Sequence, residues 1–211
     1  MVRLILVRHG ESEYNVLKKF SGQLDVPLTE LGRKQAEITA KYILQTKKID
    51  VIYSSDLSRA VDTVKPVADA LGLPIHTEKG LREICLGDWT GMQIEDVREK
   101  HSEAYQAYQN GARAVNGESR GDVLKRAMKA VMEIAQREEG KTVLVGSHNG
   151  TIRLILQDLL KQSGRTTEQL PVLPNNSLSE IVFDGESFFV ERIGEVAYLE
   201  ALKTTQDKDL L

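Results

Sequence analysis

Two histidines in this chain follow short aliphatic segments of the kind that form buried β-strands. His9 comes after the segment Val2–Val7, and His148 comes after the segment Thr142–Gly146. In an open α/β sheet, ligands bind in the crevice outside the carboxyl ends of the strands. If the two strands are neighbours, both imidazoles lie in one pocket, where histidine can transfer protons or attack a substrate. The alternative is two unrelated polar strand ends.

Two arginines are predicted at the same edge of the sheet. Arg59 falls in the first turn of the helix after the segment Asp50–Ser54, where the positive end of the helix dipole disfavours a cation. Arg8, next to His9, is a second cation at a strand end. The helix that opens at Gly150 would add backbone N–H donors, which suit a phosphate. Together these residues indicate an anion site, whereas Arg59 taken alone is equally consistent with a solvated helix face.

The elements that must position these residues alternate along the chain. Short β-branched or aliphatic runs predict strands over Val2–Val7, Asp50–Ser54, Thr142–Gly146, Leu178–Phe183 and Phe188–Ile193, the last two joined by a turn at Asp184-Gly185. Apolar periodicity predicts helices from a cap at Thr29 to about Gln45, and over Leu57–Leu71, Ile94–Tyr108, Gly121–Arg137 and Gly150–Lys161. In the second helix, Pro66 predicts a kink or an early end, and Gly72 a C-terminal cap. This alternation predicts an α/β fold with three layers, a mostly parallel open sheet flanked by helices.

Composition and charge exclude several classes of protein. The 211 residues include 28 basic and 31 acidic side chains, and the net charge of −3 gives no electrostatic footprint for nucleic acid. Nothing in the sequence resembles a signal peptide, and no apolar stretch approaches the roughly 20 residues of a membrane span. Cys85 is the single cysteine, which is typical of a reduced protein. We expect one cytoplasmic domain over residues 1–211, a disordered tail at 203–211, and no nucleic-acid or membrane partner.

A series of motifs resembles the histidine phosphatase superfamily, the phosphoglycerate-mutase-like proteins. The match begins at Arg8-His9-Gly10-Glu11 with Asn15 and covers about residues 2–193. Further motifs follow in the family's order: Phe20-Ser21-Gly22, Pro27-Leu28-Thr29-Glu30-Leu31-Gly32, Tyr53-Ser54-Ser55-Asp56-Leu57-Ser58-Arg59-Ala60, Leu81-Arg82-Glu83-Ile84, Gly87-Asp88-Trp89, Gly117-Glu118-Ser119 and Ser147-His148. Tyr14 and Asn149 depart from the commoner pattern, which bears on substrate preference more than on chemistry.

The resemblance implies roles for the residues at the predicted site. His9 would attack phosphorus and form a phosphohistidine, with its other ring nitrogen bonded to the Gly10 carbonyl, and Glu83 would be the general acid. Three cations would stabilise charge on the phosphoryl oxygens: Arg8, Arg59 and a His148 protonated beside the dianion. Five further groups would line the site: Asn15, Ser21, Gly22, Asn149 and Gly150. No cofactor is implied, and the absence of a close His/Cys/Asp cluster in the sequence predicts that no metal is needed.

Three functions are compatible with these residues. We expect a phosphatase acting on a small phosphorylated metabolite, because the stretch Ile84–Asn116 is short and its cations are dispersed. A cofactor-dependent phosphoglycerate mutase is the alternative, and it would need additional cations for a second phosphate. A non-catalytic phospholigand-binding regulator is the third, although such a relative should have lost His9, Glu83 or a cation. The lid, roughly Gly91–Gly117, is expected to select the ester, and the oligomeric state is left open.

Several other residues are predicted to have no part in the chemistry. His76 and His101 are expected on the surface, since solvated histidine is the commoner case for an edge strand or an exposed helix. Trp89, Tyr105 and Tyr108 are expected to pack in the core or the lid rather than to stack on a substrate.

Overall fold

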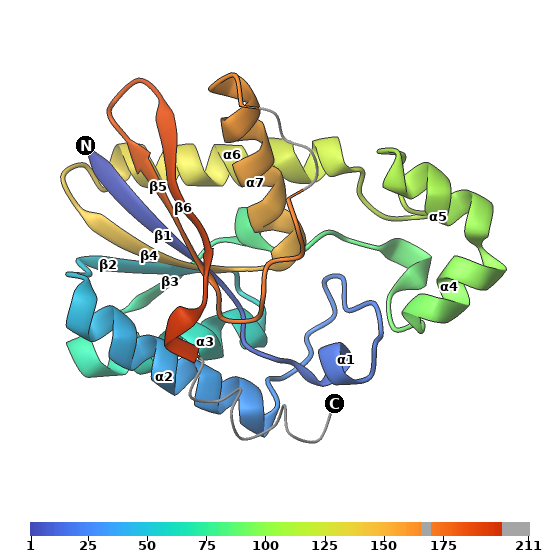
Figure 1. Ribbon diagram of the computed structural model, residues 1–211, viewed down its shortest axis with the longest axis horizontal. Coiled ribbons are helices and arrows are strands. Elements are labelled where there is room, and N and C mark those ends of the chain that lie inside the picture. Colours follow the sequence, from blue (N-terminus) through green and yellow to red (C-terminus); the bar gives the residue numbers. More distant parts are fainter. Residues whose placement is uncertain (166–169, 200–211) are drawn as a thin grey trace.

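A six-stranded sheet forms the centre of the computed structural model, which describes residues 1–165 and 170–199 (Figure 1). The strands lie in the order β3-β2-β4-β1-β5-β6. Their bounds are β1 Val2–Arg8, β2 Val51–Ser54, β3 Ile75–Thr77, β4 Thr142–Ser147, β5 Leu178–Phe183 and β6 Phe188–Glu195. The tail that the sequence predicted to be disordered, 203–211, lies outside the described residues.

The sheet is parallel through its centre and antiparallel at one edge. β3, β2, β4 and β1 run parallel to their neighbours, whereas β5 is antiparallel to β1, and β6 to β5. The N–H of Asp184 donates to the Ser187 carbonyl at 3.2 Å across the β5–β6 turn, and Gly185 has a φ of +116° there. This conformation favours glycine. The predicted hairpin is confirmed, and the sheet is mixed rather than wholly parallel.

The central strand β1 is buried on both faces because its side chains alternate between two hydrophobic clusters. Leu4 and Leu6 belong to the cluster that includes α6 and α7, whereas Ile5 and Val7 belong to the cluster that includes α2 and α3. The bounds of these helices are α2 Glu30–Thr46, α3 Ser58–Leu71, α6 Arg120–Arg137 and α7 Asn149–Gln162. A strand covered by helices on both faces needs a continuous apolar run. The predicted three-layer α/β architecture is confirmed.

Local sequence signals set several of the helix ends. The side chain of Thr29 accepts a hydrogen bond from the Gly32 N–H at 3.0 Å and caps α2, as predicted. Gly72 ends α3 with a φ of +66°, also as predicted. Helix α3 continues through Pro66 to Leu71, so an early end at the proline is wrong. The short elements not predicted as such are helix α1 Glu13–Val16 and the 3₁₀ turns Lys79–Leu81, Gly87–Trp89 and Ala197–Leu199.

The expected lid contains two helices where the sequence predicted one over Ile94–Tyr108. Helices α4 and α5 are separated at His101, where φ is −125° and ψ is 36°. They span Ile94–Lys100 and Ser102–Gln109 and stand to one side of the sheet (Figure 1). Val97 on α4 and Tyr108 on α5 pack in a third hydrophobic cluster, whose other buried members are Ile84, Leu86, Trp89, Ala114 and Val123. The packing predicted for Trp89 is therefore confirmed, whereas Tyr108 and Tyr105, which pack in and against this cluster, also line the cavity described below.

Two further observations concern the surface of the described residues. His76 and His101 are both exposed, as the sequence predicted. Within residues 1–165 and 170–199, no helix combines the length and the apolar character needed to cross a membrane.

Candidate active site

The two histidines meet at the carboxyl ends of neighbouring strands. β1 and β4 are parallel neighbours in which Arg8 pairs with Ser147, and the N–H of His9 donates to the Ser147 carbonyl at 3.0 Å. His148 directly follows the end of β4 and precedes α7, and the two imidazole centroids are 5.2 Å apart. Both rings are buried, with exposed fractions of 5% for His9 and 0% for His148. The predicted convergence of the two strand ends is confirmed.

Hydrogen bonding fixes the tautomer of His9. Its Nδ1 lies 2.7 Å from the Gly10 carbonyl, as the resemblance implied. A carbonyl only accepts, so Nδ1 carries the proton and Nε2 keeps the lone pair. Burial, together with the charges of Arg59 and Arg8, holds the pKa of His9 well below its usual value. The imidazole is therefore neutral near pH 7, which is the state a nucleophile requires.

His148 is also neutral in the free protein. Its Nε2 lies 2.9 Å from the Ser55 hydroxyl, and its Nδ1 is buried with no hydrogen-bond partner among the described residues. Burial, Arg59 and His9 hold its pKa well below the usual value. The positive charge that the sequence analysis expected beside a dianion is thus not present before an anion arrives.

Arg8 and Arg59 are buried cations held by backbone carbonyls instead of carboxylates. Arg59, with an exposed fraction of 0%, donates to the carbonyls of Gly22 at 2.9 Å and Leu24 at 2.8 Å. Arg8 donates to the Leu173 carbonyl. Burial lowers the pKa of Arg8 to about 10 and also lowers the pKa of Arg59. In both side chains Nε is buried and has no partner in the described ranges, so each keeps a donor for an anion.

Asn15 is oriented by contacts that use its oxygen. Its Oδ1 accepts hydrogen bonds from the N–H and hydroxyl of Ser12, each at 3.0 Å, and from Asn175 Nδ2 at 3.2 Å. The amide NH₂ of Asn15 is thereby directed away from these donors, and Asn15 lines the cavity. Asn175 Nδ2 also donates to the His9 carbonyl at 3.0 Å. The sequence analysis missed Asn175, and its place in a loop before β5 gave no signal.

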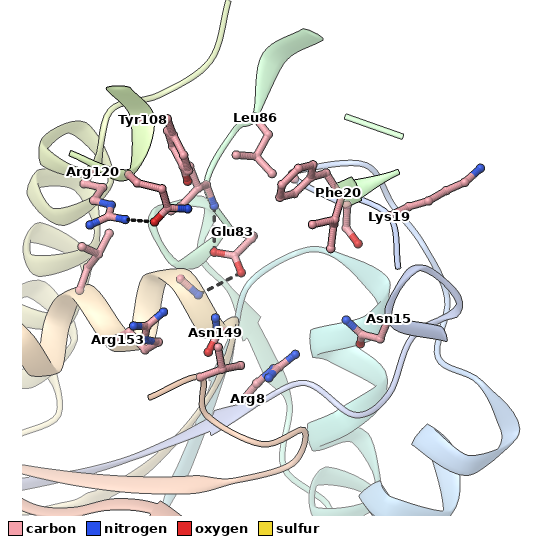
Figure 2. A pocket seen from close by; sticks show the side chains of 18 of the residues that line it. Arg8, Asn15, Lys19, Phe20, Glu83, Leu86, Tyr108, Arg120, Asn149 and Arg153 are labelled. Carbon is pink, nitrogen blue, oxygen red and sulfur yellow. Dashed lines mark hydrogen bonds between the residues drawn. The ribbon is translucent and has the colours of Figure 1, made fainter. Parts of the chain in front are cut away.

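The side-chain carboxylate of Glu83 lies at the N-terminus of α7 and accepts hydrogen bonds from its first N–H groups. Its Oε2 accepts from the Gly150 N–H at 3.1 Å, and its Oε1 accepts from the N–H groups of Thr151 at 3.2 Å and Ile84 at 3.0 Å. Figure 2 shows the carboxylate projecting into the cavity near Asn149. The backbone N–H of Gly150, which we expected to bind phosphate, is therefore engaged by Glu83 in the free protein. The helix N-terminus positions the carboxylate instead.

An arginine on α6 holds the loop that carries Glu83. Arg126 donates to the backbone carbonyls of Gly80, Arg82 and Glu83 at 2.7–2.9 Å, and its Nε lies 2.7 Å from Glu118 Oε1. An arginine in the middle of an amphipathic helix gives no sequence signal for this role, which was therefore not predicted.

A cavity of about 390 Å³ joins these groups and extends toward the lid (Figure 2). It is lined by every residue that the sequence analysis placed at the site except His148: Arg8, His9, Asn15, Ser21, Gly22, Arg59, Glu83, Asn149 and Gly150. The lining also contains four cations that the analysis did not assign: Lys19, Arg98, Arg120 and Arg153. Arg120 is the first residue of α6, where the positive end of the helix dipole disfavours a cation, as it does at Arg59.

The described residues contain no group of three or more His, Cys, Asp or Glu side chains placed to hold a metal ion.

Comparisons with known proteins agree with this geometry. The family described as histidine phosphatase superfamily (branch 1) matches residues 4–196. Phosphoserine phosphatase 1 of Hydrogenobacter thermophilus is 39% identical over 163 residues, covering 76% of this chain and 77% of that protein. Phosphoglycerate mutase-like protein 4 of Arabidopsis thaliana is 34% identical over 203 residues, covering 93% and 86%. The solved structure of Bacillus stearothermophilus YhfR, 31% identical, matches with a TM-score of 0.86 over 94% of this chain and 100% of that chain.

Proposed function

The chain belongs to the histidine phosphatase superfamily (branch 1), and we propose that it hydrolyses small phosphate monoesters through a phosphohistidine on His9. One observation carries this proposal: a neutral imidazole with its lone pair on Nε2 shares the cavity with two buried arginines, each of which has an unpaired N–H donor. Such an arrangement attracts a phosphate dianion and places a nucleophile beside it.

In the first step, His9 Nε2 forms a bond to phosphorus while the ester P–O bond breaks. Arg8 and Arg59 stabilise the charge on the phosphoryl oxygens, and each would contribute about 4 kcal/mol at 4 Å and an effective dielectric constant near 20. The Asn15 amide adds a neutral donor. Glu83 gives its proton to the departing alkoxide, because an alcohol is a far better leaving group than its anion.

In the second step, water attacks the phosphohistidine. The Glu83 carboxylate now accepts a proton from that water, the P–N bond breaks, and inorganic phosphate leaves. The position of the Glu83 carboxyl group at the N-terminus of α7 supports its roles as acid and as base. The Gly150 and Thr151 N–H groups hold it in one place through both steps.

The mutase alternative would require cations for a second phosphate. Of the three dispersed cations in the stretch Ile84–Asn116, Lys100 forms an ion pair with Asp96, and Arg113 with Asp122. Neither lines the cavity, whereas the third, Arg98, does. Within that stretch only Arg98 is therefore placed to bind a second phosphate, whereas Lys19, Arg120 and Arg153 line the cavity from other elements, so a direct assay separates hydrolysis from isomerisation. Isomerisation of 3-phosphoglycerate, measured with a bisphosphoglycerate primer, would exceed phosphate release if the mutase alternative held.

The experiment that tests the proposal compares the wild type with His9→Ala on p-nitrophenyl phosphate. Phosphate release should fall to the background rate, because the variant lacks the imidazole that attacks phosphorus in this mechanism. His76→Ala, which removes an exposed histidine from β3, is the matched control and should hydrolyse the ester at the wild-type rate. Turnover by His9→Ala equal to the wild type would contradict the mechanism.

The same proposal includes three simpler features. The chain acts as one domain, works in the cytoplasm, and needs neither a metal nor a cofactor. The single cysteine supports a reducing compartment, and the neutral nucleophile supports chemistry without a metal-activated water.

A further inference from the structure

The cavity holds more positive charge than a phosphate monoester needs. Six basic side chains line it and one acidic side chain, Glu83, lines it with them, although the protein as a whole carries a net charge of −3. Arg8 and Arg59, whose charges act on His9, account for the phosphoryl group. The remaining cations are Lys19, Arg98, Arg120 and Arg153. Hydrolysis of a simple phosphate monoester does not require these four additional positive charges.

Arg153 is the most informative of these cations. It lies on α7 three residues after Gly150, whose N–H holds Glu83, and residues at this spacing share one face of a helix, roughly 5–6 Å apart. One nitrogen, Nη2, donates to the Leu170 carbonyl, while Nε is buried and has no partner among the described residues. Burial and the nearby charge of Arg120 lower the pKa of Arg153. A donor that is buried and unpaired costs free energy unless a ligand uses it.

Arg120 approaches the same part of the cavity from another element. It is the first residue of α6, where the positive end of the helix dipole disfavours a cation. Its Nη2 donates to Gln109 Oε1 on α5 at 3.2 Å, and its guanidinium carbon lies 5.9 Å from the centre of the Tyr108 ring. Figure 2 shows Arg120 and Arg153 on the same side of Glu83, with Asn15 on the other side.

We propose that Arg153 and Arg120 form a subsite for a carboxylate on the substrate, so that the preferred esters are short phosphorylated carboxylic acids. This inference rests on the proposed function, because it assigns the part of the substrate that lies beyond the ester oxygen. A guanidinium group has a planar fork of donors that matches a carboxylate. Arg153 lies one helical turn from Gly150, whose N–H binds the Glu83 carboxylate. This short separation matches a substrate whose carboxylate is only a few bonds from the ester oxygen.

The test compares two esters that differ only at the acid group. In 3-phosphoglycerate a carboxylate stands where glycerol 3-phosphate has a hydroxymethyl group, and the rest of the skeleton is shared. The wild type should hydrolyse 3-phosphoglycerate with a kcat/KM about 10- to 100-fold higher, the range expected for hydrogen bonds to a charged group. Propane-1,3-diol bisphosphate is the third substrate, since a second phosphate is the other anion that two arginines could bind.

Variants then assign the preference to residues. In Arg153→Gln the ratio of the two kcat/KM values should fall toward one, chiefly through a higher KM for 3-phosphoglycerate, and Arg120→Gln should lower it in part. Arg153→Lys should restore part of the preference, because it keeps the charge and loses the fork. Lys161→Gln is the matched control, since it removes an exposed charge from the last turn of the same helix and should leave the ratio unchanged.

A binding measurement distinguishes the loss of carboxylate recognition from poor folding of a variant. Calorimetry on His9→Ala, which cannot turn the ester over, should show tighter binding of 3-phosphoglycerate than of glycerol 3-phosphate, and the added substitution Arg153→Gln should remove the difference. Similar kcat/KM values for both esters in the wild type, a preference that survives in Arg153→Gln, or faster hydrolysis of the bisphosphate would each overturn the carboxylate subsite while the phosphatase stands. Failure to hydrolyse any ester, p-nitrophenyl phosphate included, would instead overturn the proposed function.

Discussion

Replacing Arg59 by methionine should separate activity from stability. The side chain has an exposed fraction of 0% and donates to two carbonyls, yet no carboxylate forms an ion pair with it in the described part of the chain. Losing its interaction with the phosphoryl group removes about 4 kcal/mol of transition-state stabilisation. This corresponds to a fall in kcat/KM of roughly a thousandfold.

The folded protein should tolerate the same change. The variant loses two charged hydrogen bonds, each contributing about 1.5–3 kcal/mol, and leaves the carbonyls of Gly22 and Leu24 without them. In exchange it no longer buries an unpaired charge, whose effective penalty is several kcal/mol. Since the two effects are similar in size and opposite in sign, the Tm should change by only a few degrees.

The assay combines kinetics with thermal unfolding in inorganic phosphate. At a phosphate concentration 100 times its Kd, the wild type gains about 2.7 kcal/mol of stability, and Arg59→Met should gain almost none at that concentration. Arg33→Met removes an exposed arginine from α2 and is the control, with wild-type kinetics and the full phosphate effect. An Arg59→Met protein that keeps the phosphate effect and the kcat/KM of the wild type would refute the reasoning.

Three further outcomes are expected. The depressed pKa values of His9 and His148 mean that the unfolded chain binds more protons than the folded one, so stability should fall as pH drops below about 6.5, by about 1.4 kcal/mol per pH unit for each histidine. Unfolding midpoints between pH 7 and pH 5 check this, and His148→Gln should weaken the slope, whereas an unchanged slope would contradict it. Glu83→Gln should lower the rate for an alkyl phosphate by about 10²–10⁴-fold and the rate for p-nitrophenyl phosphate far less, because p-nitrophenolate needs little protonation to leave. Dialysis against EDTA should leave phosphate release unchanged, and a loss that added metal restores would contradict metal independence.

The strand ends were predictable because the signals that define them are local. The aliphatic runs before Arg8 and His148 identify buried strands, and adjacency in a parallel sheet brings their carboxyl ends together. The bond from His9 to the Gly10 carbonyl joins neighbouring residues, and the resemblance to the family was enough to anticipate it. Thr29 and Gly72 are helix caps that could be predicted because their residue types are the ones that favour those positions.

Contacts between distant segments were not predictable in the same way. The N-terminus of α7 offers N–H groups to any acceptor, and the sequence does not say that Glu83 rather than a phosphate takes them. Asn175 reaches Asn15 from 160 residues away, through a loop with no regular structure. The break at His101 had no proline or glycine to mark it, and the continuous apolar pattern across it predicted one helix.

The central claim is that phosphate passes through a covalent bond to His9. The most direct measurement is the mass of the enzyme quenched in alkali during turnover, followed by mapping of its peptides. The account predicts one added phosphoryl group on the peptide that contains His9, lost on acid treatment and absent from His9→Ala. Full turnover with no phosphorylated peptide, or a phosphoryl group on another residue, would contradict it.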